Sequence, residues 1–251
     1  KFSKNIFNDI NLSKYSWFNL GGPAEYLFKP ENQTQLLEFL QYNKQTNLNI
    51  TILGAGSNTL IRDKGIKGVV IKLGSNFSKI KLVNDDLIEV GAGTLDRKIA
   101  DFAKVNGVGG LEFLSCIPGS IGGSVKMNSG CYESDISKVL VSIKIIDSIE
   151  CKEKEIRKEN IKFFYRGTNL PDEFIITSIK LKGKKTPVEI IEKYQKGLIQ
   201  KKKLTQPSQI KTCGSTFKNL NSEKKAWQII KEAQCDKLKE GDASISEKHC
   251  N

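Results

Sequence analysis

Two glycine-rich segments are the stretches of this 251-residue sequence best suited to holding a phosphorylated ligand. The first, LGAGSN at 53–58, follows a short apolar run, and its glycines would let backbone amides approach phosphate oxygens closely. It does not complete the GxGxxG pattern, since Thr59 stands at the third glycine position, so a plain tight turn is an equal alternative. The second segment, 110–130, has three glycines, one proline and two serines between residues 118 and 124. It predicts a site for a flat, phosphorylated dinucleotide, with a structural turn as the alternative.

Two smaller clusters carry side chains that could act on a substrate. FFYR at 163–166 places one of only four arginines beside aromatic residues, although such an arginine is usually a surface residue with a packed stem. CGSTFKN at 213–219 sets a serine after a glycine, with a lysine and an amide nearby. An ordinary serine–threonine turn is the alternative there. Neither cluster alone decides between a structural and a catalytic role.

The composition excludes a membrane protein, a collagen, a disordered tail and a small disulfide scaffold. Hydrophobic residues make up 38% of the chain, which supports a sizeable core, and no apolar run approaches the roughly 18 residues needed to cross a bilayer. The first residues contain no secretion signal, so we expect a cytoplasmic protein without membrane insertion. The 40 Lys and Arg against 28 Asp and Glu give a formal charge of +12, but only four are arginine, the residue that base recognition favours. A phosphorylated small ligand explains this charge as well as nucleic acid does, and we expect no nucleic-acid partner.

Cysteine and histidine content argues against metal and hydrolase chemistry. The six cysteines form no CxxC pair and His249 is the only histidine, so neither a zinc site of usual spacing nor a Ser–His–Asp triad is expected. A disulfide framework is not expected in a chain of this length without a secretion signal. Cys116 and Cys131, near the second glycine-rich segment, are expected to be small packed thiols.

Short strands and helices mix irregularly along the first 185 residues. Asn32 and Gln35 resemble a capping box before a helical stripe of leucines. Thr94 is expected to cap a helix that closes at residues 106–107. Strands are expected at 49–53, 68–73, 87–90 and 174–177. This order lacks the regular alternation of a parallel βαβ sheet and predicts the α+β class.

A second region is expected to begin near residue 186. Residues 186–189, TPVE, combine a capping box with proline at the first helical position, and predict a long helix that ends in the lysines at 201–203. Such a helix between two glycine-rich regions suits a connector between domains. Ser222 is expected to begin another helix, with apolar residues on one face between 226 and 233.

In this order and spacing the motifs resemble those of the UDP-N-acetylenolpyruvoylglucosamine reductases, or UDP-N-acetylmuramate dehydrogenases, of bacterial peptidoglycan synthesis. The resemblance starts at YSWFNLGGPA (15–24), continues through LGAGSN, GLEFLSCIPGSIGG, YRG and GSTFKN, and reaches GDASISEKHCN at 241–251. IPGSIGG also occurs in flavoproteins of the vanillyl-alcohol oxidase type, whereas GSTFKN and SEKH are much more specific to the reductases. A strand soon after YRG, without an inserted tyrosine-bearing segment, resembles the shorter branch of the family.

The resemblance implies an α+β fold with a two-lobed FAD-binding region of the vanillyl-alcohol oxidase (PCMH) type at 1–185. Its lobes, about 1–73 and 74–185, would clasp non-covalent FAD, and a smaller α+β substrate-binding domain would occupy 186–251. The residues implied to line the cofactor are Gly54, Ala55, Gly56, Ser57, Asn58, Pro118, Gly119, Ser120, Gly122 and Gly123.

The resemblance also implies a reaction, the reduction of UDP-N-acetylglucosamine-enolpyruvate to UDP-N-acetylmuramate. NADPH would reduce the flavin, whose N5 would pass hydride to the enolpyruvyl double bond. Arg166 matches the position of the cation that stabilises the developing enolate, and Ser215 that of the proton donor. Lys203 and Asn219 match substrate-contacting positions, and Tyr165 would brace Arg166 and contact the substrate. No metal ligand and no obligate protein partner are implied.

The sequence departs from the family pattern near the flavin and at its end. Lys126, Cys131 and Glu133 replace commoner apolar or small residues, and Leu220 stands where proline is usual. The family's catalytic glutamate is expected beyond Asn251, and the sequence lacks a starting Met, so we expect an incomplete chain. The alternatives are a truncated form that binds ligands without turnover, another FAD oxidoreductase of the same fold, such as a hydroxy-acid or alcohol oxidase, and a basic nucleic-acid-binding module.

Overall fold

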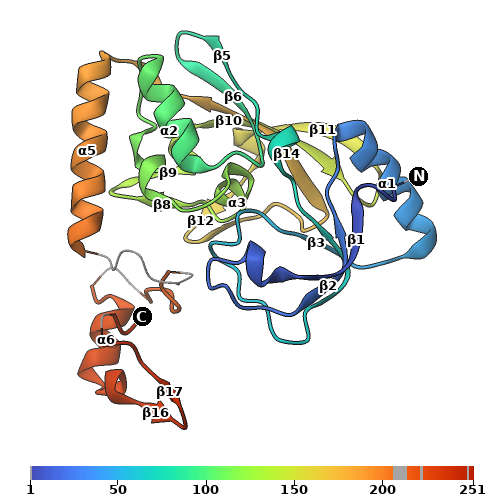
Figure 1. Ribbon diagram of the computed structural model, residues 1–251. Helices are drawn as coiled ribbons and strands as arrows, with labels where there is room; N and C mark the ends of the chain where they lie inside the picture. The colour runs from blue at the N-terminus through green and yellow to red at the C-terminus, as the bar shows by residue number, and fades with distance from the viewer. Residues whose placement is uncertain (1, 206–213, 221–222, 248) are drawn as a thin grey trace.

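The computed structural model describes residues 2–205, 214–220, 223–247 and 249–251. The N-terminal part forms a four-stranded sheet in the order β1-β2-β4-β3 (Figure 1). Strands β1 and β2 are antiparallel, whereas β4 runs parallel to both β2 and β3. The strands are β1 (Ile6–Asn11), β2 (Pro23–Phe28), β3 (Ile50–Ile52) and β4 (Ile66–Ile71). The predicted strands at 49–53 and 68–73 are therefore present, the second of them starting earlier than expected.

Helix α1 (Gln33–Thr46) connects β2 to β3 and begins as the sequence predicts. The Asn32 side chain accepts a hydrogen bond from the Gln35 backbone N–H at 2.9 Å, which satisfies one of the unpaired donors of the first turn. The Gln35 side chain accepts from the backbone of Glu31 at 2.6 Å, one residue earlier than in an ideal capping box. The helix ends at Asn47, whose left-handed φ of 51° closes it.

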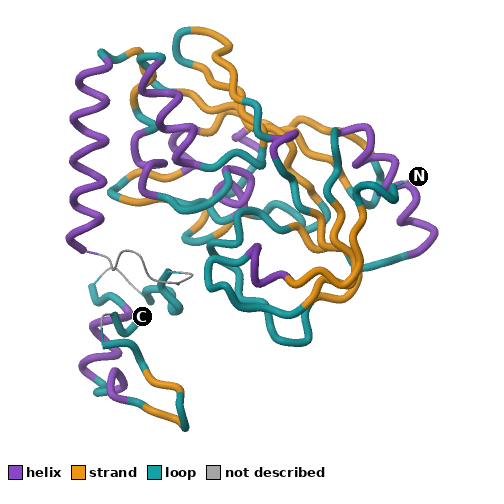
Figure 2. Tube along the Cα trace, viewed as in Figure 1, coloured by secondary structure: helices purple, strands orange, loops and turns teal. Residues whose placement is uncertain are grey.

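The second sheet has five antiparallel strands in the order β11-β10-β14-β6-β5, and it occupies the middle of the molecule with helices outside it (Figure 2). Its central strands β10 and β14 consist mainly of buried residues with branched side chains. The strands are β5 (Ile80–Asn84), β6 (Leu87–Gly91), β10 (Leu140–Asp147), β11 (Lys152–Arg157) and β14 (Phe174–Lys182). The expected strands at 87–90 and 174–177 are both part of it.

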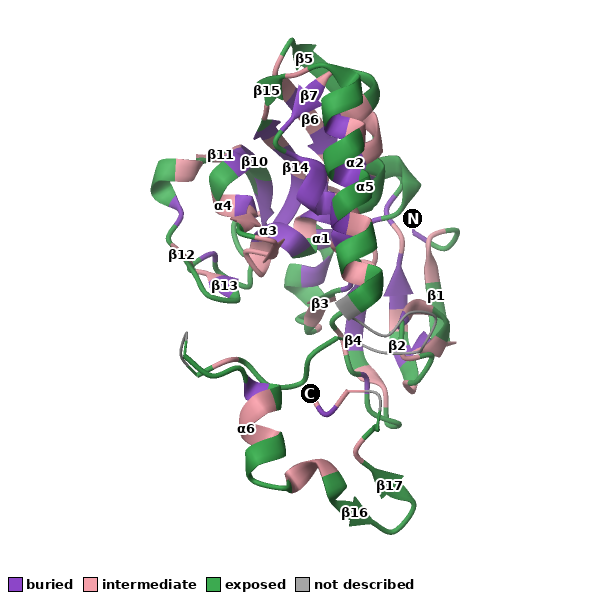
Figure 3. Ribbon diagram, turned by 90° about the vertical axis from the view of Figure 1, so that its left-hand side faces the viewer, coloured by how far each residue is buried: buried purple, intermediate pink, exposed green. Residues whose placement is uncertain are grey.

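One hydrophobic core joins the two sheets. It includes Phe28 and Ile71 of the first sheet together with Ile88, Ile143 and Ile179 of the second. The buried residues gather around β10, β14 and α2, while α6, β16 and β17 are mostly exposed (Figure 3). A shared core makes relative motion of the sheets costly, because separating them exposes apolar surface. The predicted lobe boundary at residue 73 stays a prediction.

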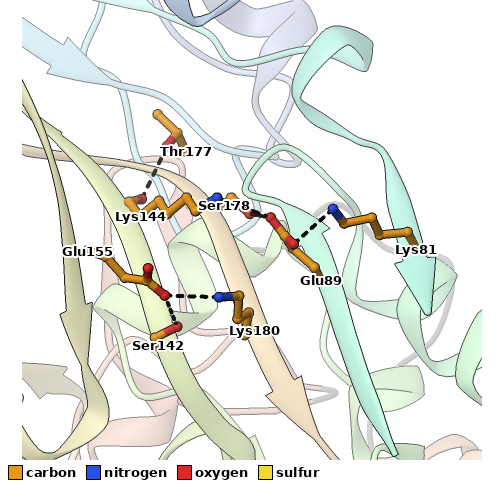
Figure 4. A network of polar contacts seen from close by, with 8 residues as sticks. All are labelled: Lys81, Glu89, Ser142, Lys144, Glu155, Thr177, Ser178 and Lys180. Atoms are coloured by element: carbon orange, nitrogen blue, oxygen red, sulfur yellow. Dashed lines mark hydrogen bonds and ion pairs between the residues drawn. The ribbon is translucent and has the colours of Figure 1, made fainter. Parts of the chain in front are cut away.

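A polar network crosses the strands of the second sheet (Figure 4). Glu89 on β6 lies 3.1 Å from Lys81 on β5 and 3.5 Å from Lys144 on β10. On the neighbouring strands, Glu155 accepts from Ser142 at 2.7 Å and from Lys180 at 3.1 Å. These cross-strand pairs help to fix the sheet's register, although each partly exposed pair contributes little to stability.

Helix α2 (Asp96–Val105) starts one residue later than the sequence predicts. Leu95 occupies the N-cap position without a side-chain bond, so the prediction that Thr94 caps the helix is wrong. The cause is a tertiary contact: the Thr94 carbonyl accepts from Ile121 N–H at 2.9 Å, and Leu95 bridges to Ser120. This pairing holds residues 94–95 in extended backbone against the second glycine-rich segment.

Helix α5 (Val188–Thr205) runs along one side of the molecule and leads to the C-terminal segment (Figure 1). The predicted helix is present, but its predicted capping box is wrong. The Thr186 hydroxyl donates to the Lys184 carbonyl at 3.0 Å, because residues 184–185 pair with residues 108–109 as a short ladder. Ile191, Gln195 and Leu198 form its buried face.

The C-terminal segment contains α6 (Ala226–Glu232) and the hairpin of β16 (Lys239–Glu240) and β17 (Ala243–Ser244). Helix α6 starts after Lys225, and the predicted start at Ser222 lies outside the described residues. Within the described part of this segment, Ala226 and Cys250 are the buried apolar residues. Its internal core is therefore thin.

Short elements complete the fold. The remaining helices are α3 (Ile121–Lys126), α4 (Ile136–Val139) and the 3-10 turns η1 (Leu12–Tyr15), η2 (Ser75–Phe77), η3 (Glu112–Cys116), η4 (Lys158–Asn160) and η5 (Cys235–Lys237). The remaining strands are β7 (Val108–Gly109), β8 (Gly130–Cys131), β9 (Ser134–Asp135), β12 (Phe163–Phe164), β13 (Gly167–Thr168) and β15 (Lys184–Lys185). Among the described residues, no helix combines the length and apolarity that a membrane crossing needs.

Candidate active site

Tyr165 and Arg166 form the two-residue loop of the β12–β13 hairpin. Phe163 pairs with Thr168 and Phe164 with Gly167, which leaves residues 165–166 at the tip. Arg166 has a φ of 64°, in the left-handed region that closes such a turn, and its guanidinium lies 5.5 Å from the Tyr165 ring centre. A Cβ on Gly167 would lie 2.4 Å from the Phe164 ring, so a larger residue beside the tip would have to displace this exposed ring. The hairpin therefore presents an exposed arginine braced by an aromatic ring.

Ser215 and Asn219 lie on the segment 214–220, which hydrogen bonds connect to three other parts of the chain. Asn219 N–H donates to the Tyr165 hydroxyl at 3.5 Å, and the Asn219 side chain accepts from Ala226 N–H, at the start of α6, at 3.0 Å. Phe217 N–H donates to the Asn251 side chain at 2.7 Å, and the amide of Asn251 donates back to the Phe217 carbonyl at 3.2 Å. These bonds hold the serine-bearing segment next to the hairpin.

A cavity of about 1440 Å³ brings Arg166, Ser215, Asn219 and His249 together. It lies between the main body, the end of α5 and the C-terminal segment. Its described lining contains seven basic and two acidic side chains, Asp236 and Glu247. The basic residues are Arg166, Lys201, Lys202, Lys225, Lys231, Lys237 and Lys239. Such an excess of positive charge favours a ligand with several negative charges.

Lys203 is not among the residues that line this cavity, whereas Lys201 and Lys202 are. Lys203 is exposed on α5, while the Lys202 ammonium donates to the Cys116 carbonyl at 2.6 Å and so connects α5 to η3. Tyr165 is also outside the lining and contacts the site through Arg166 and Asn219. The assignment of substrate contacts to Lys203 and Tyr165 stays a prediction.

The first glycine-rich segment, Gly54–Asn58, forms an open loop after β3. None of its five backbone N–H groups has a hydrogen-bond partner in the described parts of the chain. Gly56 has a φ of 71°, and a Cβ there would lie 1.9 Å from the Tyr15 carbonyl oxygen. Lys72 lies behind the loop and donates to the Gly54 carbonyl at 2.6 Å; burial, and then the nearby charge of Lys29, lower its pKa. Consecutive unpaired amides of this kind suit an anionic group such as a pyrophosphate.

The second predicted cofactor segment, Pro118–Gly123, packs directly against the first. A Cβ on Gly54 would lie 2.6 Å from the Ser120 hydroxyl, and a Cβ on Gly119 would lie 3.6 Å from the Ser57 hydroxyl. The N–H groups of Gly119 and Ser120 likewise have no described partner. The two segments, far apart in sequence, thus form one amide-rich cradle. Its residues fit the phosphate part of a dinucleotide, although they lie outside the lining of the 1440 Å³ cavity.

Replacing Gly56 by alanine is expected to weaken FAD binding at least tenfold, because the new methyl group would lie 1.9 Å from the Tyr15 carbonyl oxygen and the amide-bearing loop would have to move. Fluorescence titration of FAD into the apo-protein measures the effect. The matched control is Gly197→Ala on α5, where a Cβ meets nothing within 4 Å and alanine improves helix propensity. Equal FAD affinity of both variants would contradict a cofactor site between these segments.

Asp96 is a buried carboxylate directly beneath the second segment, and the sequence analysis missed it. It is fully buried; its Oδ2 accepts from the Ser124 hydroxyl at 2.7 Å, while its Oδ1 has no partner within the described structure. Its backbone N–H donates to the Gly119 carbonyl at 3.1 Å. Burial raises the pKa of Asp96 to about 7, against the lowering effect of the Ser124 hydrogen bond. In sequence it reads as an ordinary acidic residue in the first turn of a helix.

Asp96→Asn is expected to remove a pH dependence of stability. Because the folded-state pKa of about 7 exceeds the ordinary 3.8, the folded protein binds more protons between these values. The free energy of unfolding should therefore fall as pH rises from 4 to 7, by roughly 4 kcal/mol at most, and level off above that. Urea unfolding at pH 5, 6, 7 and 8 measures it. Asp85→Asn, at a residue 79% exposed, should keep the wild-type slope; an unchanged slope in Asp96→Asn would refute the assignment.

The lysines of the C-terminal segment are further site residues that sequence reasoning missed. Lys225, Lys231, Lys237 and Lys239 line the cavity together with Trp227. Their signal in the sequence is the basic character of residues 224–239, which contain five lysines. That signal is weak in a chain where lysine is abundant throughout.

Comparisons with known proteins agree with this geometry. Residues 24–149 match the family model described as an FAD binding domain, and residues 206–251 match that of the UDP-N-acetylenolpyruvoylglucosamine reductase C-terminal domain. The chain is 46% identical over 257 aligned positions to the UDP-N-acetylenolpyruvoylglucosamine reductase of Pelagibacter ubique, covering 100% of this chain and 84% of the relative. It is 44% identical to that of Rickettsia bellii, covering 97% and 80%. The crystal structure of the Thermus caldophilus reductase superposes with a TM-score of 0.84 at 32% identity, covering 97% of this chain and 86% of that one.

Proposed function

The chain belongs to the UDP-N-acetylenolpyruvoylglucosamine reductase family, and from this premise we propose the roles of its individual side chains. It is an FAD-dependent oxidoreductase that reduces the enolpyruvyl group of UDP-N-acetylglucosamine-enolpyruvate in peptidoglycan precursor synthesis. When bound, FAD supplies the hydride for the carbon–carbon double bond. NADPH is the proposed reductant, and the cytoplasm the proposed location.

The cradle of Gly54–Asn58 and Pro118–Gly123 is the proposed site of the FAD phosphates. Backbone amides on both segments, which have no partner among the described residues, support this role, because they can donate to phosphate oxygens without rearrangement. Because the cradle consists of the two segments in contact with each other, it exists only when both are in place.

Arg166 is proposed to stabilise the negative charge that develops on the substrate carboxylate during hydride addition. A fixed cation lowers the barrier most where it is held before the reaction begins. The two-residue hairpin and the Tyr165 ring hold Arg166 in this way. Its exposure to the cavity leaves the guanidinium available to an incoming carboxylate.

Ser215 is proposed to donate the proton that completes the reduction. A serine hydroxyl is a poor acid in water, so this role needs neighbouring positive charge, which the basic lining of the cavity supplies. Asn219, Lys203 and Tyr165 are proposed to contact the UDP-sugar. The proposed domain division, with 186–251 as the substrate-binding part, agrees with the position of Ser215 on the C-terminal side of the cavity.

The observation that carries the proposal is that Arg166 and Ser215, from separate parts of the chain, line one strongly basic cavity. The test is anaerobic: the protein-bound flavin is reduced, UDP-N-acetylglucosamine-enolpyruvate is added, and reoxidation is followed by absorbance. Rapid reoxidation is expected. A flavin that stays reduced with this substrate would overturn the assigned roles.

A further inference from the structure

Cys116 and Cys131 form a pair of thiols on the wall of the basic cavity. Cys116 is the last residue of η3 and Cys131 the last of β8, and these two elements pack against each other. The Cys131 sulfur contacts η3 itself, at the Phe113 carbonyl three residues before Cys116, and both cysteines line the cavity that contains Arg166 and Ser215. Both cysteines are in the free thiol form. Cys116 is buried and Cys131 half-buried, and the cavity is the side from which a small molecule would reach them.

The surroundings favour a thiolate on Cys116 and a thiol on Cys131. The hydrogen bond from Cys131, a hydrogen bond from Ser115 and the charge of Lys202 together lower the pKa of Cys116 to about 6, against the effect of burial. The same hydrogen bond, followed by burial and the charge of Cys116, raises the pKa of Cys131. The Ser115 hydroxyl lies 3.7 Å from the Cys116 sulfur, and the Cys131 sulfur lies 3.3 Å from the Phe113 carbonyl oxygen. One sulfur is thus a nucleophile while the other keeps its proton.

We propose that Cys116 and Cys131 are a modification site at which hydroperoxides convert two thiols into an intrachain disulfide. The Cys116 thiolate attacks the peroxide, takes one oxygen to become a sulfenic acid and releases water from hydrogen peroxide. The Cys131 sulfur then attacks the sulfenic sulfur, forming the disulfide and releasing a second water. Two thiols are oxidised by two electrons and one peroxide is reduced to two waters. A dithiol reductant reverses the change by thiol–disulfide exchange.

The oxidation state of this cysteine pair would affect both the second cofactor segment and helix α5. Cys116 is two residues before Pro118, the start of the second cofactor segment, and its carbonyl accepts the Lys202 ammonium of α5 at 2.6 Å. A disulfide would connect η3 covalently to β8 and remove the thiolate from a cavity with seven basic side chains. This inference concerns the thiols alone and does not depend on the proposed roles of Arg166 and Ser215.

Peptide mapping tests the proposal directly, because the sequence separates the two cysteines. Trypsin cleavage after Lys104, Lys126 and Lys138 gives peptides 105–126 and 127–138, each with one cysteine. The protein is treated with hydrogen peroxide, alkylated and digested. We expect a cross-linked peptide that dithiothreitol separates again, formed at least ten times faster than Cys151 and Cys235 are oxidised.

Single substitutions distinguish the two sulfurs. Cys131→Ser should stop at the sulfenic acid, which dimedone labels on peptide 105–126. Cys116→Ser should lower the rate of peroxide reaction at Cys131 at least tenfold. The control variant Cys151→Ser, at a sulfur that contacts the Ser148 carbonyl at 3.6 Å, should form the cross-link at the wild-type rate. If the wild-type protein yields no cross-linked peptide, or if Cys116 reacts no faster than Cys235, the proposal is wrong.

Discussion

Ser215→Ala is expected to slow product formation by about 10²–10⁴-fold while NADPH still reduces the flavin at the wild-type rate. The serine lines the basic cavity, whereas no residue of the cofactor cradle is among the described residues that line it. Removing its hydroxyl therefore removes the proton donor without disturbing FAD. Stopped-flow absorbance separates the two half-reactions, with reduction followed after adding NADPH and reoxidation after adding the enolpyruvyl substrate.

Thr216→Ala is the matched control for this experiment. Thr216 also carries an exposed hydroxyl and is the next residue in the chain, but it does not line the cavity. Its variant should keep both half-reactions. Normal turnover of Ser215→Ala would show that a different group, such as water, donates the proton.

Arg166→Ala is expected to slow flavin reoxidation by substrate by about 10²–10³-fold, with FAD binding unchanged. The hairpin tip contacts the cavity and the segment 214–220 rather than the amide cradle. Because the proposed interaction strengthens as charge develops, kcat should fall much more than KM rises. Arg166→Lys should recover part of the rate, since it restores the charge without the planar guanidinium.

Arg157→Ala provides the control for loss of an arginine elsewhere, because Arg157 is exposed at the end of β11. It should leave both half-reactions intact. If Arg166→Ala raises KM and leaves kcat unchanged, Arg166 binds the substrate without acting on its transition state. If both constants are unchanged, Arg166 has no part in the reaction.

Helices α1, α2, α5 and α6 and strands β3, β4, β6 and β14 were predictable from the sequence. Strands β1, β2, β5, β10 and β11 were not predicted, and neither were two helix starts. Thr94 and Thr186 both have the residue type of an N-cap, but distant segments decide what they contact. Thr94 is held by Ile121, and Thr186 N–H donates to the Gly107 carbonyl at 2.8 Å. Capping preferences reflect hydrogen bonds between residues close in sequence. A hydrogen bond to a distant segment can replace the capping bond.

Which lysine of α5 faces the cavity could not be predicted, because the apolar residues of this helix are ambiguous about its buried face. Ile190 and Tyr194 suggest one face, yet they are 59% and 54% exposed. The buried face is instead Ile191, Gln195 and Leu198. Continuing four residues along the same face reaches Lys202, not Lys203. A buried glutamine, Gln195, which donates to Asp101 at 3.0 Å, is what obscures the pattern.

The cofactor segments were predictable as motifs, but Asp96 and the thiol pair were not. Motifs such as LGAGSN and IPGSIGG are continuous in sequence, so they can be recognised from their residue types alone. Asp96 acquires its raised pKa only because the fold closes the second segment over it. Cys116 and Cys131 become a pair only because η3 packs on β8. A raised pKa or a thiol pair that depends on contact between two distant segments cannot be recognised from the sequence of either segment.

Helix α5 connects the core rigidly to one wall of the cavity. Ile191, Gln195 and Leu198 form its buried face, and Lys201 and Lys202, three and four residues beyond Leu198, line the cavity. At a rise of about 1.5 Å per residue, the two lysines lie roughly 5 Å beyond Leu198 along the helix axis. Lys202 also donates to the Cys116 carbonyl at 2.6 Å, so both lysines move together with the packed part of the helix. Substitutions in the packing of α5 against α2 would therefore change the width of a site that they do not touch.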